Sequence, residues 1–389
     1  MATERINGRE RAFGGARCRT IRDPASDGSP EPAKAPAARD PVSSRLLLRP
    51  VQGGEITGPG VETESSFPID GIRGKEHETP MLVSTILVML SFGLLFLGAE
   101  WLVRGGGGLA LRLGLTPLVV GLTVVAYGTS APELLVSLKA AWSGQPGIAV
   151  GNVIGSNIFN IAVILGVAAL IRPVKVESVV IRRDAPVMIG ATLAGLAVLW
   201  DGRVTRWEGG LLVAASAAYT FWIVAQARKE GADGTDSPQA MPTARALFFL
   251  AGGLLVLVIG SQLLVGNAVV LARGFGVSEA IIGLTVVAAG TSMPELATSA
   301  VGALRGQSDI ALGNVIGSNI FNLLFVMGLS AVVHPIDGEV LRGVDQVFLL
   351  GTAIVLMPML ATGRLVSRKE GALLLVGYAL YLTLMWPKG

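Results

Sequence analysis

The fold is decided by a stretch that occurs twice: residues 121–160 read GLTVVAYGTSAPELLVSLKAAWSGQPGIAVGNVIGSNIFN, and residues 283–322 read GLTVVAAGTSMPELATSAVGALRGQSDIALGNVIGSNIFN. The two stretches align without a gap at a constant offset of 162 residues, and 28 of their 40 positions are identical. Self-similarity of this kind indicates a chain built from two copies of one unit. The unit extends beyond the stretch, because Gly209 and Gly371 each follow an Arg-x-Glu sequence at the same offset.

The composition is typical of a membrane protein. Of the 389 residues, 51% are hydrophobic and only 15% are charged, whereas a soluble domain usually carries about 25% charged residues. After Met81, short polar breaks separate apolar runs, most of them near or above the ~20 residues that cross a bilayer as a helix. The one cysteine, Cys18, and the two histidines, His77 and His334, lie outside these runs, which disfavours a disulfide, a zinc site or a histidine-based enzyme.

We predict an all-α polytopic membrane protein with ten transmembrane helices. They lie near residues 82–103, 116–141, 148–171, 185–200, 208–227, 244–272, 279–304, 310–333, 345–361 and 370–386. Because each copy of the unit holds five spans, an odd number, the second copy enters the membrane from the opposite side. The sequence therefore predicts two inverted five-helix repeats, a plan that many secondary transporters use.

The chain divides into four segments. Residues 1–80 mix Arg, Pro, Gly, Ser and acidic residues without apolar periodicity, which indicates a disordered tail or, alternatively, a chain whose translation starts at Met81. Residues 81–227 are the first repeat, residues 228–243 a short cytoplasmic linker, and residues 244–389 the second repeat.

Basic residues in the short loops predict the orientation. Thirteen Lys and Arg residues lie on one side of the ten predicted spans and eight lie on the other. The side with more basic residues is the cytoplasmic one. We therefore expect a multi-pass protein of the inner (plasma) membrane with both termini outside.

Two acidic residues lie deep within apolar spans. Glu133 and Glu295 each end a Gly-Thr-Ser-x-Pro-Glu motif. A charged side chain at the centre of a membrane helix costs about 3 kcal/mol on insertion scales. No Lys or Arg occurs at a comparable depth in the sequence, so a bound cation is the expected partner of the two carboxylates.

The prolines of these motifs add backbone oxygens to the set. Pro132 cannot donate a hydrogen bond to the carbonyl of Gly128, four residues earlier, and Pro294 leaves the carbonyl of Gly290 free in the same way. In lipid such carbonyls need a partner, and we expect a cation to supply it. Carboxylate, hydroxyl and carbonyl oxygens are ligands suited to Ca²⁺ or Na⁺.

The next span supplies a polar stripe with a spacing of four residues. In the first copy it consists of Asn152, Ser156 and Asn160, and in the second of Asn314, Ser318 and Asn322. The neighbouring glycines would let this helix approach the broken one closely: Gly151, Gly155, Gly313 and Gly317. A proline kink and Ser or Asn contacts between helices would be the structural alternative, but duplication of the whole set favours a binding site.

Other polar residues in the spans are expected to be structural. Glu100 lies near the end of the first predicted span, and its repeat counterpart is Gln262, so we expect an interfacial or packing role. Asp184 and Asp345 begin predicted spans and are candidate helix caps. The expected interfacial anchors are Trp142, Trp200, Trp207 and Trp386.

GTSAPE, GTSMPE and the two copies of GNVIGSNIFN resemble the repeats of the cation/calcium exchanger superfamily, and in particular its prokaryotic sodium/calcium exchangers. The resemblance covers residues 82–386 and implies four central cation sites, one suited to Ca²⁺ and the others to Na⁺. By position, the implied ligands are Glu133, Glu295, Thr129, Thr291, Ser130, Ser292, Ala126, Ala288, Ser156, Asn160, Ser318 and Asn322. Some members carry Asp where this chain has Asn160 or Asn322, so the stoichiometry stays open.

The expected function is secondary active exchange of Ca²⁺ for Na⁺ by alternating access at a central site. A Ca²⁺/H⁺ antiporter on the same scaffold is the nearest alternative, a cation channel is a second one, and an enzyme is not expected. The expected partners are the transported Ca²⁺ and Na⁺ ions and the lipid bilayer. We expect no cofactor, no nucleic acid and no obligate protein partner.

Overall fold

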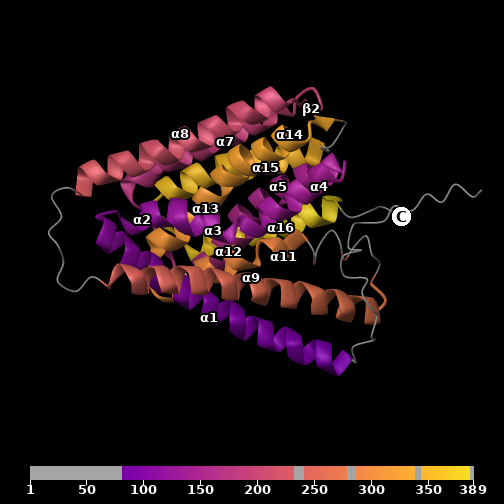
Figure 1. The fold of residues 1–389 in the computed structure, drawn as a ribbon, viewed down its shortest axis with the longest axis horizontal. Coiled ribbons are helices and arrows are strands. Elements are labelled where there is room, and N and C mark those ends of the chain that lie inside the picture. Colours follow the sequence, from indigo (N-terminus) through magenta and orange to yellow (C-terminus); the bar gives the residue numbers. More distant parts are fainter. Residues whose placement is uncertain are drawn as a thin grey trace, which may run out of the picture. The chain divides into compact units, whose positions relative to one another are not determined.

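The computed structural model describes residues 81–231, 241–277, 282, 286, 288–337 and 343–385. The predictions for residues 1–80 and for most of the linker 228–243 lie outside these residues. The described chain is mostly helical (Figure 1).

The first half begins with a long helix and continues with a broken one. Its helices are α1 (Met81–Leu113), α2 (Pro117–Val120), the π-helix η1 (Gly121–Val125), α3 (Ala126–Thr129), α4 (Ala131–Trp142), α5 (Pro146–Phe159), η2 (Asn160–Leu165), α6 (Gly166–Ile171), η3 (Val180–Asp184), α7 (Ala185–Val198) and α8 (Arg206–Gly231). Two short strands interrupt the loops, β1 (Val174–Lys175) and β2 (Arg203–Val204).

The second half follows the same order. Its described helices are α9 (Thr243–Gly274), α11 (Ala288–Thr291), α12 (Met293–Leu304), α13 (Ser308–Phe321), η5 (Asn322–Val326), α14 (Met327–Val333), α15 (Gly343–Ala361) and α16 (Arg368–Met385). Its strands are β3 (Ile336–Asp337) and β4 (Leu365–Val366).

Six of the described helices are long and apolar enough to cross a membrane, judged by length and composition. Each coincides with a predicted span: Met81–Leu113, Pro146–Ile171, Arg206–Lys229, Thr243–Gly274, Ser308–Val333 and Gly343–Ala361. A seventh span is present if Pro117–Thr129 and Ala131–Trp142 are taken as one helix bent by 46°. This bend lies at the predicted proline break of the second span. The predicted end of the first span at residue 103 is wrong, because α1 continues to Leu113.

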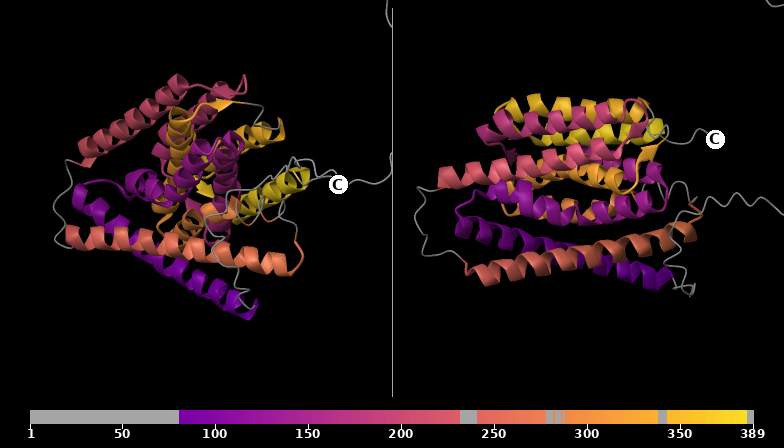
Figure 2. Two further views of the ribbon diagram at one scale, coloured as in Figure 1. Left: turned by 45° about the vertical axis from the view of Figure 1, so that its right-hand side comes forward. Right: turned by 45° about the horizontal axis from the view of Figure 1, so that its top comes forward.

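The helices α1 and α9 lie side by side (Figures 1 and 2). Glycines bring their backbones into contact: a Cβ atom built on Gly253 would lie 2.6 Å from the backbone nitrogen of Leu102 and 2.7 Å from the carbonyl oxygen of Gly98. Real atoms do not approach so closely, so that only glycine permits this crossing.

The helices that carry the polar stripe are the most buried of the six. Within their most apolar stretches, 72% of Pro146–Ile171 and 83% of Ser308–Val333 are buried, and in Figure 1 α5 and α13 lie between α8 and the α1–α9 pair. The predicted close approach is confirmed for Gly313 and Gly317, because a Cβ on Gly317 would lie 2.5 Å from the carbonyl oxygen of Leu122. It is not seen for Gly151 and Gly155, where no described atom would lie within 4 Å of a Cβ. The stripe therefore occupies the core of the described chain.

Contacts between the two halves are reciprocal. Val174 of β1 pairs with Val366 of β4, and Val204 of β2 pairs with Ile336 of β3, both antiparallel. Val366 and Ile336 are the counterparts of Val204 and Val174 at the repeat offset of 162 residues. Each strand pair thus joins one loop of the first half to one loop of the second.

Glu100 lies well inside α1, and its expected packing role takes the form of a bridge between helices. It is 7% exposed, and its Oε1 lies 2.6 Å from Nε of Arg104 and 2.7 Å from Nη2 of Arg305. Because Arg305 follows α12 directly, its ion pair fastens α1 to α12, while the pair with Arg104 lies within α1. Both arginines compensate the buried carboxylate.

The two aspartates predicted as helix caps both make contacts with other side chains. Asp184 makes no capping hydrogen bond to α7, and its carboxylate instead accepts hydrogen bonds of 2.7 and 3.2 Å from Arg183. Asp345 lies inside the first turn of α15 and accepts a 2.9 Å hydrogen bond from the hydroxyl of Tyr381. Both carboxylates are held by neighbouring side chains.

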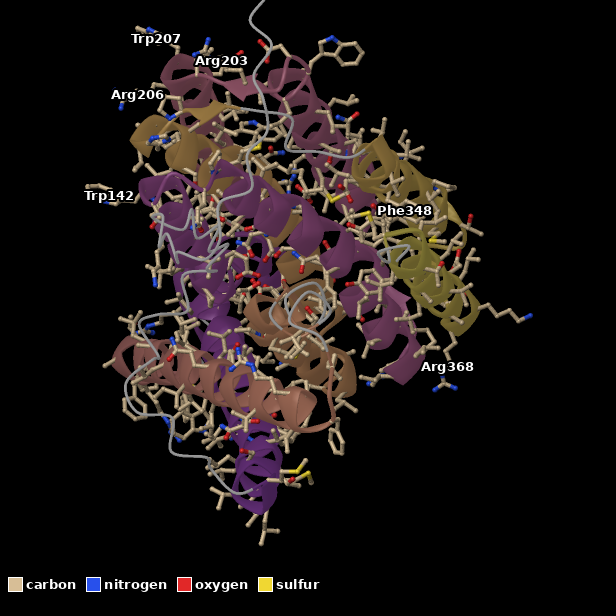
Figure 3. The ribbon with its side chains drawn as sticks, turned by 90° about the vertical axis from the view of Figure 1, so that its right-hand side faces the viewer. Trp142, Arg203, Arg206, Trp207, Phe348 and Arg368 are labelled. Atoms are coloured by element: carbon tan, nitrogen blue, oxygen red, sulfur yellow. The ribbon has the colours of Figure 1, made fainter. Side chains whose placement is uncertain are left out.

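Three of the four predicted tryptophan anchors are strongly exposed, as an interfacial position requires. They are Trp142, Trp200 and Trp207, and Figure 3 shows Trp142 and Trp207 at the edge of the molecule with their side chains directed away from the helices. Trp386 lies outside the described residues.

The contact between α1 and α9 yields a stability prediction. We expect Gly253→Ala to lower the free energy of unfolding by about 1–3 kcal/mol, because the added methyl group forces the two backbones apart. The matched control is Gly266→Ala on the same helix, where no described atom would lie within 4 Å of a Cβ. That change should be neutral or stabilise by up to about 1 kcal/mol. Thermal unfolding of the purified protein in detergent measures both effects, and equal effects would contradict the close crossing.

Candidate cation-binding site

Two helix breaks form the centre of the candidate site. In the first break Ser130 lies between α3 and α4, and in the second Ser292 lies between α11 and α12. Pro132 and Pro294 take up positions in the first turn of the new helices, where the missing N–H removes no helical hydrogen bond. The sequence therefore favours a new start of the helix at each break.

The breaks place both acidic residues in the first turn of a helix. Glu133 lies in the first turn of α4 and Glu295 in the first turn of α12. The partial positive charge at a helix N-terminus stabilises a carboxylate. Both side chains are fully buried, so this local stabilisation acts where water does not screen it.

Each break holds the carboxylate of the other half. The hydroxyl of Ser130 donates a 2.8 Å hydrogen bond to Oε1 of Glu295, and the hydroxyl of Ser292 donates a 2.9 Å hydrogen bond to Oε1 of Glu133. All four residues are fully buried. These crossed bonds bring together two motifs that lie 162 residues apart in the sequence.

Two asparagines of the polar stripe hold the breaks in place. Nδ2 of Asn152 donates to the carbonyl of Glu133 at 3.1 Å and to the hydroxyl of Ser137 at 2.9 Å, and its Oδ1 accepts from the hydroxyl of Thr291 at 3.4 Å. The sequence marked Asn152 as part of the stripe but predicted no role for it in the site.

Asn314 makes the same set of contacts in the second half. Its Nδ2 donates to the carbonyl of Glu295 at 3.3 Å and to the hydroxyl of Ser299 at 3.0 Å. Its Oδ1 accepts from the hydroxyl of Thr129 at 3.0 Å. Ser137 and Ser299 are additional residues that the sequence analysis missed, although they are counterparts at the repeat offset.

Other buried polar atoms of the site have no hydrogen-bond partner. Seven of the thirteen such side-chain atoms in the described part of the chain belong to predicted site residues: Oε2 of Glu133, Oε2 of Glu295, Oδ1 and Nδ2 of Asn160, Oδ1 and Nδ2 of Asn322, and Oγ of Ser318. Because nearly all buried polar groups in proteins are satisfied, this concentration of orphaned atoms indicates a place where a ligand is held.

Asn160 and Asn322 owe their positions to a change of helix type. Each is the first residue of a π-helical segment, η2 and η5 respectively. Such segments are rare and occur frequently at functional sites, where the wider turn redirects the side chains. The four-residue spacing in the sequence gave no sign of this change.

The remaining predicted ligands are placed as follows. Oγ of Ser156 lies 3.2 Å from Oγ of Ser292, within hydrogen-bonding distance, which adds Ser156 to the group around Glu133. The carbonyl of Ala126 accepts from the amide of Ser130 at 3.0 Å, and its oxygen lies 3.3 Å from the hydroxyl oxygen of Thr129. Ala288 begins α11, and no described contact links it to the other residues.

One expectation about the freed carbonyls is wrong. The carbonyl of Gly290 accepts a 2.6 Å hydrogen bond from the hydroxyl of Ser261 on α9, so it does not need a cation. The repeat counterpart of Ser261 is Ala99, and alanine cannot provide this contact to the first break. The repeat therefore gave no signal for it.

The ligand set of the site is made of hard oxygen atoms. It combines two carboxylates with neutral hydroxyl, amide and carbonyl oxygens, and the described residues contain no group of three or more His, Cys, Asp or Glu side chains that could hold a metal ion. No Lys or Arg makes a described ion pair with Glu133 or Glu295. Such a set suits Ca²⁺ or Na⁺ rather than a transition metal.

Comparison with known proteins agrees with this chemistry. The family model described as "Sodium/calcium exchanger protein" matches the chain twice, at residues 83–225 and 245–386. The chain is 38% identical to the inner membrane protein YrbG of Escherichia coli K12, over 79% of this chain and 98% of that protein. It is 31% identical to the sodium/calcium exchanger MaX1 of Methanosarcina acetivorans, over 78% of this chain and 99% of that protein.

A solved structure shares the fold. The sodium-calcium exchanger NCX_Mj, in crystals soaked with Na⁺ and Sr²⁺, superimposes with a TM-score of 0.69 at 30% sequence identity. The match covers 78% of this chain and 98% of the NCX_Mj chain.

The site yields a prediction about ion-dependent stability. A cation that binds the folded protein at 100 times its Kd should raise the free energy of unfolding by about 2.7 kcal/mol. We expect Glu133→Gln and Glu295→Gln each to reduce this Ca²⁺-induced gain strongly, and to leave the ion-free protein as stable as the wild type or more stable, because one of two buried, facing charges is removed.

The matched control is Glu100→Gln, which removes a buried carboxylate that two arginines already compensate. That variant should lose stability with and without Ca²⁺ alike, and keep the Ca²⁺-induced gain. Thermal unfolding with and without Ca²⁺ measures all three variants. A full Ca²⁺-induced gain in both site variants would exclude the two carboxylates as cation ligands.

Proposed function

Since this chain belongs to the sodium/calcium exchanger protein family, we propose that it is a secondary active transporter that exchanges Ca²⁺ for Na⁺ by alternating access. The family consists of exchangers and antiporters, so the chain is a membrane transporter and not an enzyme. The observation that carries the proposal is the pair of buried carboxylates, Glu133 and Glu295, each held by a serine of the other half and each with one oxygen that has no partner among the described residues.

In this proposal the two carboxylates are the main ligands of Ca²⁺ and also bind Na⁺. Hydroxyl and amide oxygens complete the shell from Ser130, Ser292, Ser156, Ser318, Asn160 and Asn322. Backbone carbonyls come from Thr129, Thr291, Ala126 and Ala288, and those of the two alanines serve outer Na⁺ sites. The orphaned atoms of Asn160, Asn322 and Ser318 support this assignment, because their hydrogen-bonding capacity is otherwise unused.

Competition for one charge pair makes the transport an exchange. The charge of the two carboxylates neutralises either one Ca²⁺ or two Na⁺, so the site cannot bind Ca²⁺ and the two Na⁺ at the same time. An empty site would bury two unpaired negative charges, which costs several kcal/mol per ion. The protein therefore moves between its inward-open and outward-open states only when Ca²⁺ or Na⁺ is bound. The helices α1 and α9, which pack on each other, are the proposed moving part.

We also propose ten spans in two inverted repeats, residues 81–227 and 244–389, with both termini outside the inner membrane. The strand pairs support this plan, because ten crossings bring the loops of β1 and β4 to one side and those of β2 and β3 to the other. A backbone contact agrees: the amide of Lys175 donates to Oγ of Ser308, and both residues belong to the proposed cytoplasmic side.

The central prediction concerns coupled flux. Proteoliposomes loaded with Na⁺ and diluted into Na⁺-free buffer should take up ⁴⁵Ca²⁺, and uptake should stop when Na⁺ inside is replaced by K⁺. We expect Glu133→Gln and Glu295→Gln to reduce the rate to below about a tenth of wild type, since ligand charge sets Ca²⁺ affinity. Asp201→Asn, in the exposed loop before β2, is the control and should transport normally.

The same vesicles separate the rival functions. Uptake that follows an imposed pH gradient and ignores Na⁺ would replace the proposal by a Ca²⁺/H⁺ antiporter at the same residues. Calcium flux that needs no counter-ion and is far faster would indicate a channel. Normal Na⁺-driven uptake by both Gln variants would refute the proposed site.

The orientation is tested by single cysteines in a Cys18→Ser background. Asp201→Cys lies in the proposed outer loop and Lys175→Cys in a proposed inner loop, and both positions are exposed. In intact spheroplasts a membrane-impermeant maleimide should label Asp201→Cys and should label Lys175→Cys only after the membrane is permeabilised. The reverse pattern would invert the orientation, and labelling of both in intact spheroplasts would contradict the ten-span plan.

A further inference from the structure

We propose that Asn152 and Asn314 are positioning residues, each of which ties the glutamate segment of its own half to the threonine of the other half. The inference rests on the proposed function, because the site that they position is the proposed exchange site. It adds a role to the polar stripe: some of its asparagines bind the transported ion and others hold the ligands.

The positioning and the ion-binding asparagines differ in how many hydrogen bonds their side-chain amides make. In Asn152 and Asn314 both N–H groups donate, one to a glutamate carbonyl and one to a serine hydroxyl, and the amide oxygen accepts from a threonine. Asn160 and Asn322 lie on the same stripe and are fully buried, and neither amide atom of either residue has a partner among the described residues. An amide has at most four hydrogen-bonding positions, so Asn152 and Asn314 have little capacity left for an ion.

The contacts of Asn314 show what is positioned. Its Nδ2 holds the backbone of Glu295, and its Oδ1 holds the side chain of Thr129 in the other half. The next residue, Ser130, donates directly to the carboxylate of Glu295. Two adjacent residues of the first break are thus fastened to the glutamate of the second half, one through the asparagine and one directly.

Asn152 repeats the arrangement in the opposite direction. It holds the backbone of Glu133 and accepts from Thr291, while Ser292 donates to the carboxylate of Glu133. In both halves the threonine that the proposed function uses through its carbonyl is therefore fixed through its hydroxyl. Displacement of one break moves ligands in both halves, so the two glutamates act as one site.

Double-mutant cycles test this inference. Asn314→Ala removes all three hydrogen bonds of the amide, including the one with Thr129, and Thr129→Val removes the hydroxyl that makes this shared bond. Each variant should raise the apparent KM for Ca²⁺ about threefold to tenfold or more, because the usual net value of one such bond corresponds to that change. Because both break the same link, the double variant should be no worse than the poorer single one. The pair Asn152→Ala and Thr291→Val should behave in the same way.

The chain offers matched controls for these pairs. Asn314→Ala combined with Thr291→Val removes two different links, so the two increases in KM should multiply. Thr129→Ser and Thr291→Ser keep the hydroxyl and should retain a KM near that of the wild type. If the variants acted only by a loss of packing, the pair Asn314 and Thr129 would behave like the pair Asn314 and Thr291. The serine variants would then also have a raised KM.

The outcomes separate this inference from the proposed function. Multiplying effects within the pair Asn314 and Thr129, or a serine variant as impaired as the valine variant, would overturn the positioning role while wild-type exchange stands. If the wild type shows no exchange, the proposed function fails. The pairs Asn314 with Thr129 and Asn152 with Thr291 are then tested by thermal unfolding without ions. If the decreases in the unfolding midpoint of the two single variants add up in the double variant, the positioning role is overturned as well.

Discussion

The structure depends on the burial of two carboxylates, Glu133 and Glu295, among helices of a membrane protein. In the described part of the chain no ion pair with an arginine or lysine is seen for them, in contrast to Glu100, whose carboxylate binds Arg104 and Arg305. Their compensation is built from dipoles: a helix N-terminus behind each glutamate and a serine hydroxyl in front of it. Dipoles leave the negative charge in place, whereas an arginine would cancel it, so that the proposed site retains an attraction for a cation.

Neither half can build this environment alone. The serine that faces each carboxylate comes from the opposite half, and the close packing of α13 against Leu122 in η1 requires Gly317 of the second half and the backbone of the first. Because the unit is duplicated, the same sequence motif supplies the serine for both glutamates, once from each copy. A motif that complements its own copy satisfies two buried charges with one sequence pattern, provided that the copies face each other.

Local residue chemistry made the centre of the site predictable. The breaks at Ser130 and Ser292 follow from proline, which fits only the first turn of a helix, and the stripe follows from its four-residue spacing. Contacts that depend on packing were not predictable. The first span was predicted to end near residue 103, yet α1 continues through the glycines at 105–108 to Leu113. A Cβ on Gly105 would lie 2.7 Å from the backbone nitrogen of Leu250, so glycine supports the crossing with α9. The π-helical turns at Asn160 and Asn322 likewise leave no pattern in the sequence.

The contacts that break the repeat are informative for the same reason. In an exchanger with two inverted copies, a contact made by both copies contributes equally to the inward-open and outward-open states, so only unmatched contacts can favour one state. Two unmatched contacts join α1 or α9 to the helices of the site: Glu100 with Arg305, and Ser261 with the carbonyl of Gly290. The counterparts of Glu100 and Arg305 are Gln262 and Ser143, which cannot form an ion pair. The counterparts of Ser261 and Gly290 are Ala99 and Gly128, and alanine cannot donate a side-chain hydrogen bond to the carbonyl at the break. In the proposed transport cycle, the difference in energy between the two states is therefore set by contacts outside the proposed ion site, so the affinity of that site and the preferred orientation of the transporter can vary independently.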